Sequence, residues 1–260
     1  MRHSSWCAML AAVIGIGCIG LLTDGFAFAE TLIVQGSAGF ADEVMRPYQD
    51  KVEALTGHKL RIVPTTGDRG LLAVLQGEAD LAMVAGPLDD MVAPLRKSRP
   101  ELPIGLLRDF RISKSRIAFP VNPDNPVRSV SVAKLKQLLS GQIDNWRQLG
   151  GPDLPIHVVS MGADNGPKRA TEEALLAGQR ITPHSALIVE NAQEIVRTIV
   201  RDRGAIGFTP ASFAKLHGLP MLQTNVLITQ SYGFVSRNEP TDAMREVIAA
   251  TRSLVFEEEP

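Results

Sequence analysis

The sequence of 260 residues has a formal net charge of −1, and 45% of its residues are hydrophobic. A near-neutral total gives no electrostatic basis for binding nucleic acid or an anionic membrane surface. The low aromatic fraction of 5% argues against a sugar-stacking surface. Both cysteines, Cys7 and Cys18, lie near the N-terminus, so we expect no disulfide and no thiolate site in the rest of the chain.

The first 29 residues have the order of a secretory signal peptide. A basic start at Arg2 and His3 is followed by a nearly continuous apolar run at 9–22, and Ala27-Phe28-Ala29 is a small-x-small cleavage site. The apolar run is shorter than the roughly 20 residues that a membrane span needs. We therefore expect cleavage after Ala29 and an exported, periplasmic protein.

Cys18 is the alternative processing site, as the anchor of a lipid. Gly15-Ile16-Gly17 before it differs from the usual Leu-x-small-Cys pattern, and the apolar run continues past the cysteine. This favours cleavage after Ala29. Residues 30–260 are then enough for one large domain or two lobes with buried cores.

Apolar runs rich in Val and Ile alternate with segments of helical period. In chain order we expect a strand at 32–34, a helix at 40–55 bent by Pro47, a strand at 60–63, a helix at 71–77, strands at 81–85 and 116–121, a helix at 131–140, a strand at 156–160, helices at 168–176 and 191–200, strands at 204–208 and 226–235, and a helix at 243–256. This alternation predicts βαβ units and a mostly parallel sheet. Ser131 is expected to cap its helix and Trp146 to pack in a turn.

Three loops follow predicted strands and lead into predicted helices, at 37–40, 65–70 and 162–168. Each offers backbone N–H groups at a helix start, where ligands bind in open α/β sheets. Small residues there let a ligand approach the backbone closely. The predicted ligand-binding residues are Ser37, Ala38, Gly39, Phe40, Thr66, Gly67, Asp68, Arg69, Gly162, Ala163, Asp164, Asn165, Gly166 and Lys168.

Four stretches carry a resemblance to a known family: GSAGF at the N-terminal end, TTGDRGLLAVLQGEADLAMVAGPL, VNPDNPV followed by VAKLKQLLSGQIDNW, and RDRGAIGFTPASFA. In their order and spacing the chain resembles the periplasmic solute-binding proteins of ABC importers, in the phosphate-binding, type II branch. The resemblance implies an α/β fold of two lobes with mixed, mostly parallel sheets, joined by two extended crossings and closing over a ligand in the cleft. It places lobe one at 30–117 plus 229–260 and lobe two at 118–228.

The resemblance also implies a function and partners. The protein would capture a small anion or polar solute, as a monomer, and deliver it to an ABC permease in the inner membrane. It would not be an enzyme and would carry no cofactor.

The sequence departs from the phosphate-binding pattern at most ligand positions. Members of that branch have a hydroxyl residue before the first-loop phenylalanine, a serine in the second loop, an aspartate after the third strand and an Arg-x-Asp-Gly-Ser-Gly-Thr loop in lobe two. The matching positions here are Gly39, Gly67, Ala85 and GADNGPK at 162–168, so Phe40 and Asp164 alone keep their identity. A desolvated oxyanion needs charge-assisted donors, so these substitutions argue against inorganic phosphate.

Two interpretations of the cleft stay open. Arg69 and Lys168 would bind a different anion if they face each other, or they are solvated charges, with Asp68 capping a helix. The pocket would also be roomier and less polar, and would suit a larger or less charged solute beside Phe40, Met83 and Met161. Alternatively, the two methionines fill the core.

Other chemistry finds little support in the sequence. His58, His157, His184 and His217 are scattered without the spacing of a metal site, and no Gly-x-Ser-x-Gly elbow is present. Two alternatives to solute transport remain: a diverged sensor or protein-interaction module of the same fold, and a periplasmic hydrolase.

Overall fold

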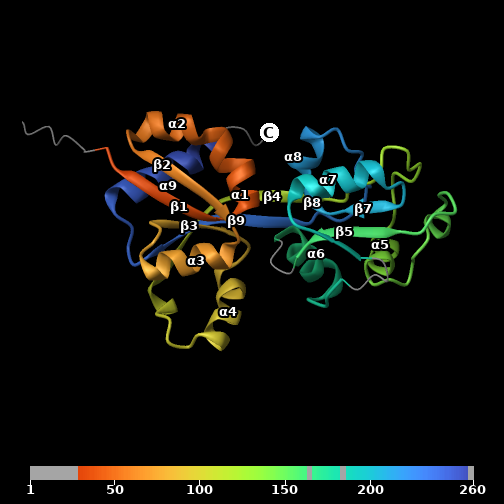
Figure 1. The fold of residues 1–260 in the computed structure, drawn as a ribbon, viewed down its shortest axis with the longest axis horizontal. Helices are drawn as coiled ribbons and strands as arrows, with labels where there is room; N and C mark the ends of the chain where they lie inside the picture. Colours follow the sequence, from red (N-terminus) through yellow and green to blue (C-terminus); the bar gives the residue numbers. More distant parts are fainter. Residues whose placement is uncertain (1–28, 163–165, 182–185, 257–260) are drawn as a thin grey trace, which may run out of the picture.

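The computed structural model describes residues 29–162, 166–181 and 186–256, which form two α/β lobes (Figure 1). The predicted signal peptide, with Cys7 and Cys18, lies outside the described residues, except for Ala29. Across the described part of the chain, no helix combines the length and the apolar character that crossing a bilayer requires.

Lobe one is built on a mixed sheet. In the described residues its strands lie in the order β2-β1-β3-β9-β4-β8, with β1 parallel to β2 and β3 and the remaining neighbours antiparallel. The strands are β1 (Thr31–Ser37), β2 (Lys59–Thr65), β3 (Leu81–Ala85), β4 (Leu107–Ala118) and β9 (Thr229–Arg237), and β8 (Thr209–Pro210), which pairs with the far end of β4, already belongs to lobe two.

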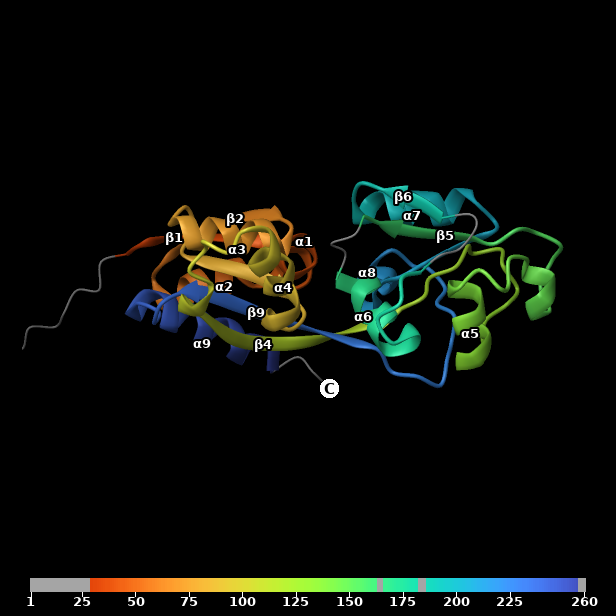
Figure 2. The same cartoon turned by 90° about the horizontal axis from the view of Figure 1, so that it is seen from below.

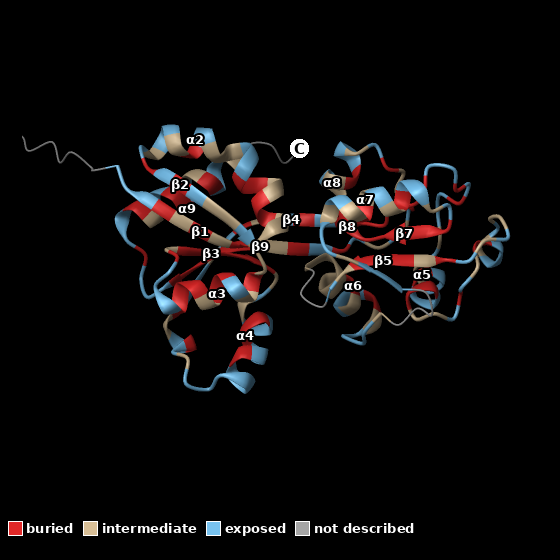
Figure 3. Ribbon diagram, viewed as in Figure 1, coloured by how far each residue is buried: buried red, intermediate tan, exposed pale blue. Residues whose placement is uncertain are grey.

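Helices cover both faces of this sheet. Successive strand residues point to opposite sides, so each inner strand contributes to two cores. In β3, Leu81 and Met83 join the core under α2 and α9, while Ala82 and Val84 join the core under α3 and α4. The helical segments are α1 (Ala38–Phe40), the π-helical turn η1 (Ala41–Met45), α2 (Arg46–Thr56), α3 (Gly67–Gln76), α4 (Leu88–Ser98), the 3₁₀ turn η2 (Ile104–Leu106) and α9 (Asp242–Phe256). Figure 3 shows the resulting band of buried strands.

Lobe two contains a parallel sheet in the order β6-β5-β7, made of β6 (Ala186–Val189), β5 (His157–Met161) and β7 (Ala205–Gly207). Its helical segments are α5 (Val132–Leu139), η3 (Trp146–Leu149), α6 (Gly166–Leu176), α7 (Ala192–Arg201) and α8 (Ala211–Leu216). Trp146 is fully buried, and its Nε1 donates to the main-chain oxygen of Gly204 at 2.9 Å. The tryptophan therefore packs, as expected, and ties the η3 turn to the residue that precedes β7.

Two long strands join the lobes. β4 and β9 pair antiparallel from Leu107–Arg237 to Arg116–Thr229, with one irregularity between Arg111 and Ser113. Both run from one half of the molecule to the other (Figure 2). They correspond to the two crossings that the family resemblance implies. The lobe boundaries at 117/118 and 228/229 stay our proposed division of the chain.

The structure differs from the predicted elements in several places. β4 begins at Leu107 instead of Arg116. Its first half was not predicted because exposed charges such as Arg108 and Arg111 interrupt its apolar residues. The helix predicted at 40–55 is not a regular α-helix throughout. The π-helical turn η1 comes before Pro47, and the missing N–H of Pro47 is tolerated at the start of α2. The sequence analysis did not predict α4, which contains Pro94, nor β6 and α8.

In the glycine-bearing turn at Thr65–Gly70, packing alone explains Gly70. A Cβ at Gly70 would lie 2.4 Å from the main-chain oxygen of Gln35, so only glycine lets α3 lie this close to β1. The second glycine of the turn thus serves the fold, and the first, Gly67, packs against Met91 and lines a cavity.

Candidate ligand cleft

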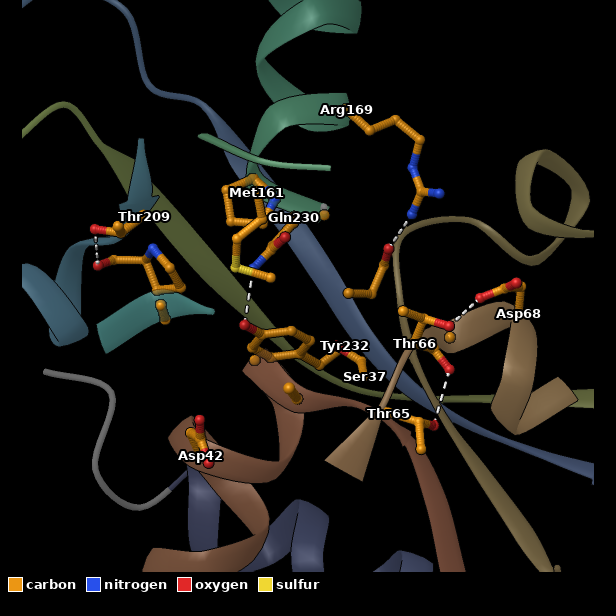
Figure 4. A pocket seen from close by; sticks show the side chains of 18 of the residues that line it. Ser37, Asp42, Thr65, Thr66, Asp68, Met161, Arg169, Thr209, Gln230 and Tyr232 are labelled. Atoms are coloured by element: carbon orange, nitrogen blue, oxygen red, sulfur yellow. Dashed lines mark hydrogen bonds between the residues drawn. The ribbon is translucent and has the colours of Figure 1, made fainter. Parts of the chain in front are cut away.

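A cavity of about 680 Å³ lies between the lobes, here called the cleft. Its walls come from the loops after β1 and β2 and from α4 in lobe one, and from β5, α6, the loop before α7, and β8 in lobe two. Figure 4 shows these walls meeting around Tyr232 and Gln230 of β9. Of the predicted binding residues, those that line it are Ser37, Ala38, Gly39, Thr66, Gly67, Asp68 and Gly166.

Four predicted residues lie elsewhere. Phe40 has no exposed surface and stacks on Tyr232 with ring centroids 5.1 Å apart, so it supports the cleft wall from behind. Lys168 faces Glu172 of its own helix at 3.6 Å. Arg69 and Gly162 are exposed and do not line the cleft. Ala163, Asp164 and Asn165 lie outside the described residues.

Arg69 and Lys168 therefore do not face each other across the cleft. Arg169, next in the chain, takes the place expected of Lys168. Its Nη2 donates to the main-chain oxygen of Ala85, so it reaches from α6 across to lobe one. Gly86 accommodates it, since a Cβ there would lie 2.7 Å from Nη2 and the backbone φ is +119°.

Asp68 does not cap its helix. Thr66 is the N-cap residue of α3, and Asp68 follows in the first turn, where a negative charge suits the helix dipole. The Thr66 hydroxyl donates to the Asp68 carboxylate (Figure 4). The second loop thus presents a carboxylate to the cleft.

Glu43 is the most heavily hydrogen-bonded carboxylate of the cleft. It accepts from Tyr232 Oη at 2.5 Å on one oxygen, and from Ser115 and Ser212 hydroxyls at 2.9 Å each on the other. Burial raises the pKa of Glu43, although these three hydrogen bonds act in the opposite direction. Burial and the neighbouring Glu43 carboxylate also raise the pKa of Tyr232. Ser212 lies in lobe two, so Glu43 links the lobes.

Gln230 extends this chain of hydrogen bonds. Its Nε2 donates to Tyr232 Oη at 2.8 Å, which leaves its Oε1 as an acceptor. Gln230 is 4% exposed, and its Oε1 has no hydrogen-bond partner among the described residues. A buried acceptor without a donor costs roughly 1–3 kcal/mol.

Of Met83 and Met161, one fills the core and the other lines the cleft. Met83 has no exposed surface and belongs to the core of lobe one, whereas Met161 lines the cleft at the end of β5. Met91 and Leu95 of lobe one and Met161 and Phe213 of lobe two add apolar side chains to the cleft lining. In the described residues, no three His, Cys, Asp or Glu side chains gather as a metal site would require.

Sequence reasoning missed the residues that β9 and η1 contribute. Gln230 and Tyr232 are two positions apart on a strand, so the strand period places them on one face, and this signal could have identified them. No local signal pointed to Glu43, because its partners Ser115, Ser212 and Tyr232 are distant in sequence.

The phosphate-binding protein PstS of Bacillus subtilis is 29% identical over 107 residues, which cover 41% of this chain and 35% of that protein's length. The chain thus matches little more than a third of that relative.

Two solved structures share the fold over most of the chain. One is described as a phosphate ABC transporter substrate-binding protein from Clostridium perfringens with bound phosphate, at TM-score 0.73 and 19% identity, covering 85% of this chain and 92% of that one. The other, an ABC-type phosphate transport receptor from Vibrio cholerae, has TM-score 0.65 and 19% identity, covering 88% and 96%.

The family itself is shown by a domain model that matches residues 27–251, nearly all of the described chain. The two-lobed α/β fold and the cleft between the lobes agree with this match. The chain belongs to the PBP superfamily and resembles its phosphate-binding members.

Proposed function

We propose that this protein is an exported substrate-binding protein of a phosphate-type ABC importer, which captures a small anion or polar solute between its lobes. The cleft supports this most directly: one cavity of about 680 Å³ is lined from both lobes, so a solute bound there contacts both. Solutes bound by both lobes favour the closed arrangement, because they bind it better than the open one. The similarity to phosphate-binding relatives supports a phosphate-type binding role as the first candidate.

Export, location and partners belong to the same proposal. The signal peptide would be cleaved after Ala29, and the mature protein would act in the periplasm as a monomer. An inner-membrane ABC permease would receive the solute from the closed form. The family is one of binding proteins, so the proposal includes no turnover and no cofactor.

Ligand-dependent stabilisation tests the proposal. Thermal unfolding is followed with phosphate, other oxyanions and small polar organic solutes, each in excess. A ligand at 100 times its Kd stabilises the folded state by about 2.7 kcal/mol, which raises the melting temperature measurably. The absence of a shift with every solute would contradict solute capture.

A matched pair of variants locates the binding. Arg169 lines the cleft, whereas Arg201 at the end of α7 is exposed outside it. An anion bound in the cleft loses affinity in Arg169→Met and keeps it in Arg201→Met. Equal behaviour of the two variants toward an anion would place that anion outside the cleft.

The second candidate is a sensor or interaction module of the same fold. It is favoured by the glycine and alanine residues at positions where the phosphate-binding pattern has donors, and by Lys168, which pairs with Glu172. Ligand-free protein used as bait in periplasmic extract would then retain a defined partner, and no solute would stabilise it.

A further inference from the structure

His58 is a buried polar residue whose two ring nitrogens both have partners. The residue is 4% exposed. Its Nδ1 lies 3.2 Å from the backbone nitrogen of Glu30, and its Nε2 lies 3.1 Å from Oε2 of Glu246 on α9. A backbone N–H can only donate, so Nδ1 accepts from Glu30 and carries no proton. The ring proton is therefore on Nε2, where it donates to the Glu246 carboxylate, and the imidazole is uncharged in this arrangement.

Glu30 is held in this place by its main chain. The residue is exposed, but its backbone oxygen accepts from the Lys59 N–H at 2.8 Å, and its own N–H donates to His58. The next residue, Thr31, is the first of β1 and pairs with Lys59 of β2. The position of the Glu30 nitrogen is thus fixed by the register of the sheet.

The Glu30 nitrogen is also the atom that cleavage after Ala29 would convert into the amino terminus. Hydrolysis adds water across the Ala29–Glu30 peptide bond. Ala29 then carries a carboxylate, and the Glu30 nitrogen becomes an amine that takes up the proton released by the new carboxyl group. An α-amino group has an ordinary pKa of about 7.7–8.0, so it is mostly an ammonium at neutral pH. One uncharged N–H donor is thereby replaced by a positive group with three donors.

This ammonium would complete a charge pair that the uncleaved chain lacks. In the uncleaved chain, His58 joins a neutral amide to the carboxylate of Glu246. After cleavage, the same imidazole would accept from the ammonium of Glu30 and donate to Glu246. Hydrogen bonds to charged groups are stronger than those between neutral groups. Because the Glu246 side chain is 52% exposed, solvent moderates the gain.

The contact is specific for one first residue. A chain that begins at Ala29 keeps an uncharged amide nitrogen at Glu30, and its ammonium lies one residue further along, where consecutive Cα atoms are about 3.8 Å apart. A chain that begins at Thr31 lacks the nitrogen that contacts His58. The geometry therefore favours the same cleavage position as the small-x-small pattern at 27–29, on independent grounds.

We propose that His58 and Glu246 form a docking site for the amino terminus that signal cleavage creates at Glu30, so that processing after Ala29 stabilises the folded protein. The inference rests on the export and cleavage included in the proposed function. It does not depend on the solute, because Glu30, His58 and Glu246 lie outside the residues that line the cleft.

The first experiment identifies where the exported chain begins. The full-length protein is produced in a bacterium that has a periplasm, purified from that compartment, and its intact mass is measured. The proposal expects a chain that begins at Glu30. A chain that begins at any other residue would overturn it.

Two chains that differ by one residue test the docking itself. Each is released from a fusion whose protease leaves no extra residue, so that one begins at Glu30 and the other at Ala29. Both are unfolded in urea at neutral pH and low salt. The unfolding equilibrium constant of the Glu30 chain should be about threefold lower, and added salt should reduce the difference. Equal unfolding of the two chains would overturn the proposal.

Variants separate charge pairing from packing. Glu246→Gln keeps an acceptor for His58 but removes the negative charge, so the difference between the Glu30 and Ala29 chains should shrink. Asp153→Asn removes an exposed carboxylate in lobe two and should leave the difference unchanged. A full difference in Glu246→Gln would show that the amine is not paired through His58, and would overturn the docking site.

The reactivity of the α-amine gives a readout that packing alone would not change. A protonated, hydrogen-bonded amine is a poor nucleophile, so acylation of the Glu30 chain near neutral pH, followed by mass spectrometry, should be slower than in Glu246→Gln. Equal rates would contradict the proposed contact.

The two proposals fail separately. Equal unfolding of the Glu30 and Ala29 chains would remove the docking site and leave solute capture intact. The absence of a thermal shift with every solute, in a protein that shows the one-residue difference, would contradict solute capture and support the docking site.

Discussion

Arg169 and Ala85 join the two lobes: the guanidinium Nη2 on α6 donates to the main-chain oxygen at the end of β3. Gly86, the next residue, leaves room for the guanidinium. The bond lies at the cleft wall, where the Ser212–Glu43 hydrogen bond also joins the lobes. Both bonds favour the arrangement of the lobes that the structure shows.

Replacement of Arg169 should release this contact. In Arg169→Met the lobes of the ligand-free protein should separate further, and the radius of gyration measured by small-angle X-ray scattering should increase. Arg201→Met, an exposed change on α7, should leave the radius unchanged. An unaltered radius in both variants would show that the Arg169–Ala85 bond does not restrain the lobes.

Gly70→Ala should destabilise lobe one. The added methyl group would lie 2.4 Å from the main-chain oxygen of Gln35, so α3 must move away from β1. Overpacking of this kind costs roughly 1–3 kcal/mol, which urea unfolding would detect. Gly105→Ala is the matched control, because nothing lies within 4 Å of its Cβ position. Equal unfolding midpoints for the two variants would contradict this role of Gly70.

Glu43→Gln should change how stability depends on pH. Burial raises the folded-state pKa of Glu43 above its ordinary value of 4.5, so the folded protein keeps this proton at pH values where the unfolded chain has lost it. The contribution of Glu43 to the free energy of unfolding is therefore fully present below pH 4.5, and it is lost as the pH rises through the folded-state pKa. Relative to Glu43→Gln, the wild type should therefore lose stability as pH rises.

Urea unfolding from about pH 4 to about pH 7 measures this difference. Glu239→Gln, whose carboxylate is 78% exposed and pairs with Arg108, should show no comparable trend. A parallel pH profile for the wild type and Glu43→Gln would contradict the burial effect.

Lys59→Met should reveal the opposite pH dependence of stability, because the pKa of its partner Glu53 is lowered. The hydrogen bond from Lys59, with help from Gln49 and the Leu60 backbone, lowers the pKa of Glu53 from 4.5 to about 2. This stabilisation is present above pH 4.5 and is lost as pH falls toward 2. Because Lys59 is largely exposed, the variant should lose only a little stability at neutral pH, and the loss should vanish in acid.

The matched comparison uses a more exposed ion pair. Arg147 and Asp153 are both more than half exposed, so Arg147→Met should leave unfolding midpoints nearly unchanged at all pH values. A loss in Lys59→Met that persists at about pH 2 would show that packing of the lysine stem, rather than its charge, stabilises the region.

Local patterns predicted the inner part of the fold well. The runs at β1, β3 and β5 are apolar because both faces of their sheets are covered, and Ser131 accepts a hydrogen bond from the Lys134 backbone as an N-cap should. The patterns failed where a strand is half exposed, as in the first part of β4, and where a proline lies inside a helix, as Pro94 does in α4.

The cleft was predictable only in part. Loops after parallel strands are placed by topology, so Ser37, Gly67 and Gly166 could be expected to line one cavity. Which cation reaches the cleft depends on helix phase: Lys168 turns along α6 toward Glu172, and Arg169 points across instead. A shift of one residue on a helix turns a side chain by about 100°, beyond the accuracy of loop alignment.

The paired strands β4 and β9 restrict how the halves of the molecule move. They remain hydrogen-bonded in register up to Arg116 and Thr229, and the Ile117 backbone N–H continues with a bond to Ile228. A two-stranded ribbon bends and twists but resists stretching and sliding. If the lobes close over a solute as we propose, the ribbon would confine closure to a hinged rotation, so that the same wall residues would meet each time.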